Sequence, residues 1–221
     1  RIPWRIPVIV YGSHSDFQQT NVTWGLLPEG VQAFAEPTRK RMVVHFGGSN
    51  ADYAHTCIHE LVHMFQFDII YGSLLKSAFA QGALFRIPLW FAEGITEYYS
   101  LGGMDDEARM FMRDAAVFDY LPHNLEYAGG YMVYKAGQSA IDYLVRTYGT
   151  GKIVEIMNQL RFRRSLELAL ETTIGLSTEE LTEEWKKSVR REHWPEYADK
   201  NEPEHYGRRL TDHYKRHHYA N

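Results

Sequence analysis

The chain has 221 residues, of which 44% are hydrophobic and 24% charged, as is typical of a folded globular protein, so wholesale disorder is excluded. Its 24 Lys and Arg residues and 28 Asp and Glu residues give a formal net charge of −4 without a basic block, which predicts no nucleic-acid partner. The longest stretch without a charged residue, 17–28, is short and largely polar, so we expect no membrane span. Because the chain opens at Arg1 with neither Met nor a signal-like apolar region, we expect a processed chain or an excised segment.

The first forty-odd residues predict short strands and turns. Residues 6–11 are rich in β-branched side chains, and residues 41–46 form a second candidate strand that ends at a glycine pair. The pattern then changes, because residues 51–67 contain neither Pro nor Gly and Asn50 or Asp52 can cap a helix there.

Helix-compatible segments dominate the rest of the chain. Apolar residues recur at a spacing of three to four in the segments 92–99, 105–118, 130–148 and 152–160. Ser177 and Glu180 form a capping-box pattern, which predicts a helix that runs to about Trp194. We therefore expect an α+β fold, in which a small N-terminal mixed sheet precedes a mainly helical lobe.

His59, Glu60 and His63 lie together in the first predicted helix. Residues four apart on a helix are about 40° apart around the axis and roughly 6 Å along it, so both imidazoles project from one face. This geometry lets two His nitrogens bind one zinc ion at about 2.0–2.1 Å each. Glu60, turned about 100° from His59, can hold a water without competing as a ligand. A surface helix that carries this pattern by chance is the alternative, and the five residues alone do not exclude it.

The neighbours of this pattern favour a metal site. They are uncharged: Thr56, Cys57, Ile58, Leu61, Val62, Met64 and Phe65. We expect a buried helix here, and burying two His and a Glu without partners costs several kcal/mol, so their isolation indicates a ligand. Cys57 lies about 200° around the helix from His59, which predicts a core thiol and not a metal ligand. As the single cysteine, it also excludes a disulfide within the chain and leaves the redox compartment open.

A second helix candidate, residues 88–99, offers a third ligand. Glu93 and Glu97 are four residues apart in it, among Trp, Phe, Ala, Ile and Tyr side chains. The alternative is two solvated glutamates on an exposed face, but the flanking residues are too apolar for that interpretation.

The two helices together resemble those of the gluzincin metallopeptidases, specifically the peptidase MA-like group, with its His-Glu-x-x-His helix and its Trp-x-x-Glu-Gly-x-x-Glu-Tyr helix. The resemblance implies a zincin-like fold with Glu93 as the third zinc ligand beside His59 and His63. It implies that Glu97, where the family often has Asp, bonds a ligating His, most directly His59. Such a ligand set leaves a fourth position for water, as in a catalytic zinc site.

The resemblance extends to a Tyr-x-x-Gly pattern that begins at Tyr134. It implies that the Tyr134 hydroxyl stabilises the oxyanion of the transition state. Tyr131, one helical turn earlier, is the competing candidate. Both could instead be core aromatics in a chain with 15 Tyr residues. The resemblance also implies that the strand at 41–46 borders the cleft and pairs with the substrate backbone.

For the organisation of the chain we expect a sheet lobe with the zinc helix at 1–75, a helical lobe with the third ligand and a cleft wall at 76–195, and a polar tail at 196–221. Within these, residues 68–88 are expected to be packed helix and loop in preference to a lid over the cleft. Four tail histidines have no acidic or cysteine partners spaced to complete a metal site, so we expect a solvated or partner-docking tail. They are His205, His213, His217 and His218.

The function that these observations predict is hydrolysis of peptide bonds by a zinc metallopeptidase, with one Zn²⁺ per chain, Glu60 as general base and a peptide or protein as substrate. The alternative is a catalytically silent, zincin-like peptide-binding module of a larger protein, since such domains are often fused to further domains. The resemblance favours an exported or periplasmic location.

Overall fold

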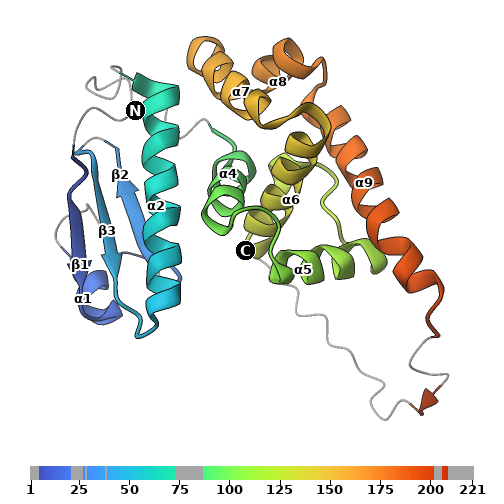
Figure 1. Cartoon of the computed structure of the whole chain (residues 1–221), viewed down its shortest axis with the longest axis horizontal. Helices are drawn as coiled ribbons and strands as arrows, with labels where there is room; N and C mark the ends of the chain where they lie inside the picture. Colours follow the sequence, from blue (N-terminus) through green and yellow to red (C-terminus); the bar gives the residue numbers. More distant parts are fainter. Residues whose placement is uncertain are drawn as a thin grey trace.

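The computed structural model describes residues 5–20, 27, 29–37, 39–72, 87–201 and 206–208. A small mixed sheet precedes a series of helices, which confirms the predicted α+β fold (Figure 1). The strands are β1 (Val8–Tyr11), β2 (Ala33–Glu36) and β3 (Arg41–His45). Their order across the sheet is β1-β3-β2, with β3 parallel to β1 and antiparallel to β2.

Strand β3 is the centre of the sheet, because it pairs on both sides. Val43 and Val44 point to opposite faces and are both fully buried. One face is covered by the short helix α1 (His14–Gln18), whose Phe17 ring contacts the rings of Phe34 and His45. The expectation that residues 41–46 border the cleft is therefore wrong. A strand with two neighbours has no free backbone groups for a substrate, and β2 is the edge strand on that side.

Helix α2 (Asn50–Tyr71) lies between the sheet and the other helices (Figure 1). Ser49, not Asn50 or Asp52, caps it by accepting a hydrogen bond from the backbone N–H of Asp52, and the helix ends at Gly72. The expectation of a buried helix is wrong in part. Ile58 and Phe65 are 45% and 43% exposed, because α2 packs on the sheet and on α4 and leaves these positions uncovered.

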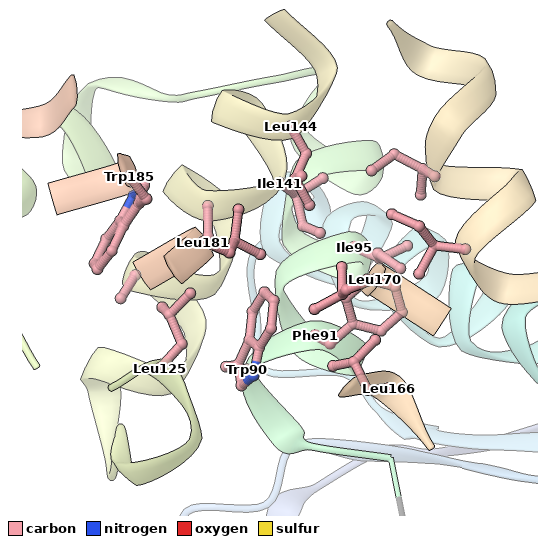
Figure 2. Close-up of a cluster of buried hydrophobic side chains, with 14 of the residues drawn as sticks. Trp90, Phe91, Ile95, Leu125, Ile141, Leu144, Leu166, Leu170, Leu181 and Trp185 are labelled. Carbon is pink, nitrogen blue, oxygen red and sulfur yellow. The ribbon is translucent and has the colours of Figure 1, made fainter. Parts of the chain in front are cut away.

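The remaining elements form the helical lobe. They are α4 (Leu89–Leu101), α5 (Asp106–Val117), the 3₁₀ turn η2 (Leu125–Tyr127), α6 (Tyr131–Tyr148), α7 (Thr150–Arg163), α8 (Leu166–Ile174) and α9 (Thr178–Ala198). The capping box at Ser177 and Glu180 is confirmed, although α9 continues through Pro195. Figure 2 shows the core of the lobe, in which Trp90 and Phe91 of α4 share one cluster with apolar side chains of α6, α8 and α9.

Several expectations concern residues that are not described. Most of the segment 68–88 lies outside the described residues, and so do the four tail histidines. The three-part division of the chain stays a prediction. None of the helices in the described ranges combines the length and apolar character that crossing a membrane requires.

Helices α4 and α6 cross at two glycines. A Cβ atom on Gly94 would lie 2.4 Å from the carbonyl carbon of Gly137, and one on Gly137 would lie 2.3 Å from the carbonyl oxygen of Trp90. Both contacts are with backbone atoms, which a side-chain rotation cannot relieve. The two backbones can therefore approach this closely only because neither residue has a side chain.

We expect Gly94→Ala to lower the free energy of unfolding by about 1–3 kcal/mol, because the added methyl group forces α4 and α6 apart. The matched control is Gly151→Ala in α7, where a Cβ would meet nothing within 4 Å. There the better helix propensity of Ala should leave stability unchanged or raise it by up to about 1 kcal/mol. Urea unfolding measures both, and equal stability of the two variants would contradict a tight crossing.

Candidate metal centre

A cavity of about 690 Å³ opens between the sheet and the helical lobe. One wall is the loop and edge strand from Gly30 to Ala35, and the other walls come from α2, α4, α5 and α6. Every residue singled out in the sequence as a ligand, base, partner or oxyanion donor lines this cavity: Glu60, His59, His63, Glu93, Glu97, Tyr131 and Tyr134. The tertiary fold thus brings all of them to one place.

His59, His63 and Glu93 form a group that could hold a metal ion. The Nε2 atoms of His59 and His63 lie 3.3 and 3.4 Å from Oε2 of Glu93. With bonds of about 2.0–2.1 Å and a tetrahedral angle, neighbouring ligand atoms on a zinc ion would lie about 3.3–3.4 Å apart. These two distances therefore match the separation expected around a zinc ion, and all three donors lie within 4.8 Å of one another.

A hydrogen bond to Glu97 determines which nitrogen of His59 is free. The Nδ1–H of His59 donates to Oε1 of Glu97 at 3.1 Å, since a carboxylate can only accept. The lone pair of a neutral imidazole then lies on Nε2, the atom that faces Glu93. Glu97 thus has the position that the resemblance implies for it.

Thr96 likewise determines which nitrogen of His63 is directed at Glu93. Its hydroxyl donates to the backbone carbonyl of Ala92 at 2.8 Å and so accepts from Nδ1–H of His63 at 3.3 Å. Gln66, fully within the interior, donates to the Thr96 hydroxyl at 2.6 Å. The sequence analysis missed both residues. Each lies three positions after a proposed ligand on the same helix, and that spacing could have identified them.

A second group of possible ligands, His55, His59 and Glu97, shares His59 with the first. A neutral His59 has one lone pair and cannot serve both groups. The Nε2–H of His55 donates to the Ser100 hydroxyl at 3.1 Å, because the hydroxyl hydrogen points to the carbonyl of Glu97. Lys135 also places its ammonium 3.0 Å from Glu97, next to where a second cation would lie. These contacts favour the first group.

Oε2 of Glu60 has no hydrogen-bond partner among the described residues, whereas Oε2 of Glu93 lies 3.3 and 3.4 Å from the Nε2 atoms of His59 and His63. An unpaired buried oxygen is costly, and Glu60 is among the residues that line the cavity, so a ligand bound beside it would relieve that cost. Cys57 belongs to neither group of possible ligands and is half-buried, so the expected core thiol is only partly buried.

The charges of the centre shift the pKa values of its residues. Burial lowers the pKa of His59, but hydrogen bonds to Glu93 and Glu97 outweigh it and raise the pKa to about 9. Burial raises the pKa of Glu93, but bonds from both histidines outweigh it and lower the pKa to about 2. Without a cation the centre therefore holds a proton on His59.

The two candidate tyrosines have different surroundings. Burial, followed by the charges of Glu93, Glu97 and Glu60, raises the pKa of Tyr134 to about 12, so its hydroxyl keeps its hydrogen at neutral pH. Burial, followed by the neighbouring carboxylate of Glu107, raises the pKa of Tyr131. Its ring also packs edge-on against Phe111.

A comparison with family models gives a match over residues 3–191 to a model described as the peptidase MA superfamily. Comparisons with curated proteins and with solved structures gave no match.

We expect zinc binding at pH 7.5 to release about one proton, because the metal needs the nitrogen that is protonated in the metal-free chain. The pKa of His59 in the folded chain lies above its ordinary value of 6.5. The proton on His59 therefore stabilises the metal-free folded chain fully below about pH 6.5, and this stabilisation is lost as the pH rises through about 9. The apparent zinc affinity should accordingly rise with pH until about 9. Titration calorimetry in buffers of different ionisation enthalpy counts the protons, and a value near zero at pH 7.5 would contradict this assignment.

Proposed function

Because the chain belongs to the peptidase MA superfamily, we propose that it is a zinc-dependent peptidase that hydrolyses peptide bonds. The observation that carries the proposal is the convergence of His59, His63 and Glu93 beside the buried carboxylate of Glu60 in one cavity. These three ligands would hold one zinc ion. When bound there, the ion would polarise the scissile carbonyl as a Lewis acid and lower the pKa of water at the site.

Glu60 is the proposed general base. Its side chain is buried and lines the cavity, the backbone N–H of Ala35 bonds its carboxyl group, and Oε2 has no hydrogen-bond partner among the described residues. Burial raises its pKa, which makes the carboxylate a stronger base than an exposed one. Glu60 would take a proton from the attacking water as the C–O bond forms and deliver it to the leaving amine as the C–N bond breaks.

The edge strand β2 supports a site for the substrate backbone. Its inner edge pairs with β3, while residues from Ala33 to Ala35 line the cavity that contains Glu60. An extended peptide could add as a further strand to the edge of β2 that pairs with no described strand, so that main-chain hydrogen bonds place its scissile bond next to the metal centre.

Tyr134 is the proposed oxyanion donor. It lines the cavity, lies close enough to Glu60 and Glu93 to be influenced by their charges, and carries a protonated hydroxyl at neutral pH. Tyr131 is a weaker candidate because it lies beside the carboxylate of Glu107.

The decisive test is digestion of a mixed peptide library, with zinc supplied, by the wild type and by Glu60→Gln. We expect Glu60→Gln to bind zinc as tightly as the wild type, because Glu60 is not a ligand, and to lose about 10²–10⁴-fold in kcat. Mass spectrometry of the products gives the cleavage sites, and atomic emission gives the zinc content. Hydrolysis that survives in Glu60→Gln with zinc bound would refute the mechanism. No cleavage by either protein, with one zinc per chain, would support the silent peptide-binding module instead.

Phenylalanine substitutions distinguish the two tyrosines. We expect Tyr134→Phe to lower kcat by about 10²-fold, because it removes a donor that acts on the developing oxyanion. Tyr131→Phe, the matched control one turn away on α6, should keep kcat within about threefold. Steady-state kinetics on one peptide of the library measures both, and equal losses would contradict the assignment of Tyr134.

A further inference from the structure

Lys135 is a buried cation that the proposed reaction does not use. It lies on α6, is 4% exposed, and places its Nζ atom 3.0 Å from Oε2 of Glu97 on α4. A buried ammonium group is costly unless it is paired and hydrogen-bonded, so its place in the interior requires a partner. Glu97 is that partner.

The other groups around Lys135 lie farther away. Nζ is 3.9 Å from Asp105, which caps α5, 3.8 Å from Glu107 on α5, and 5.6 Å from the ring centre of Tyr131. Glu107 is largely exposed, whereas Glu97 is buried. The short bond to Glu97 is therefore the one that the solvent weakens least.

Glu97 links Lys135 to the metal centre. Its two carboxylate oxygens have different partners: Oε1 accepts from Nδ1 of His59 at 3.1 Å, and Oε2 accepts from Lys135 at 3.0 Å. The carboxylate cannot rotate without losing one of these bonds. Lys135 thus determines the orientation of Glu97, which in turn determines the orientation of the His59 ring.

We infer that Lys135 is a positioning residue of the metal centre, which acts through Glu97 to keep Nε2 of His59 directed at the metal. The inference rests on the proposed function for the presence of a metal. Beyond the ligands on α2 and α4 and the Glu97 carboxylate that bonds one of them, the inference adds a cation from α6.

The sign of one measurement separates positioning from other roles of Lys135. Removing a positive charge near a zinc ion would by itself raise the zinc affinity, because like charges repel. Loss of positioning lowers the affinity, as substitutions of residues that orient ligands typically do. A merely structural role would lower thermal stability and leave the zinc affinity of the folded chain unchanged.

The experiment is a zinc titration of the full chain against a competing chromophoric chelator. We expect Lys135→Met to weaken zinc binding about tenfold, the lower end of the range for such partners. The matched control is Lys186→Met, since Lys186 is also buried and bonds a carboxylate, Glu183, at 2.9 Å. It lies on α9, outside the cavity lining, and its zinc affinity should equal that of the wild type.

A double-mutant cycle tests whether the effect passes through Glu97. In the Glu97→Gln background, Lys135→Met should no longer weaken zinc binding, because the link to His59 is already weakened and only the loss of the like charge remains. A tenfold loss in both backgrounds would overturn the inference. If Lys135→Met does not fold, Lys135→Gln replaces it. Its side chain is one bond too short to reach Glu97, so a loss in the same direction is expected.

The visible spectrum of the cobalt-substituted chain adds a readout of ligand geometry. We expect Lys135→Met to alter the position or intensity of the d–d bands and Lys186→Met to leave them unchanged. Zinc affinity of Lys135→Met equal to or above that of the wild type would overturn the positioning role. Absence of zinc binding by the wild type would instead refute the proposed function, so the two failures are distinguishable.

Discussion

The backbone contact between Gly94 and Gly137 is the constraint on which the candidate site depends. Helix α4 carries Glu93 and Glu97, and α6 carries Tyr134 and Lys135, so the crossing determines how these side chains lie relative to one another. Side-chain contacts across a helix pair tolerate small adjustments, whereas two backbones in direct contact do not. The apolar cluster around Trp90 then holds both helices against the rest of the lobe (Figure 2).

The polar groups of the site are organised in layers around the cavity. His59 and His63 each donate one ring hydrogen away from the centre, to Glu97 and Thr96, and direct the other nitrogen inward. Lys135, which bonds Glu97, and Gln66, which bonds Thr96, are themselves buried. Because each outward hydrogen bond is satisfied inside the protein, the inward nitrogens of both rings are directed at the place where a metal ion would bind.

The sheet contributes to the candidate site through its edge strand β2. Strand β3 is paired on both sides and anchors the sheet, which leaves β2 as the edge that faces the helical lobe across the cavity. The backbone of β2 also bonds Glu60 through Ala35. A peptide added to this edge would therefore lie beside Glu60, which the strand bonds, and beside the candidate ligands on α2 and α4.

The sequence by itself determined the features that depend on local periodicity. The spacing of His59 and His63, that of Glu93 and Glu97, and the capping box of α9 each lie within one helix, where position along the chain dictates which side chains share a face. The α+β class followed from the change of period after the second strand. Glu60 was identified as a candidate base because it lies next to His59 in the same helix pattern.

Only the tertiary structure decided which faces meet. Strand β2, with four residues and two alanines, has too weak a local signal to predict, and its role as the edge strand follows from pairing with β3. Lys135 is 38 residues from Glu97, and no periodicity relates them. The Tyr-x-x-Gly pattern favours Tyr134 over Tyr131, but only the fold shows that α5 presents Glu107 to Tyr131 and that the ligand-bearing helices present carboxylates to Tyr134. Such contacts depend on how helices cross, which local sequence does not specify.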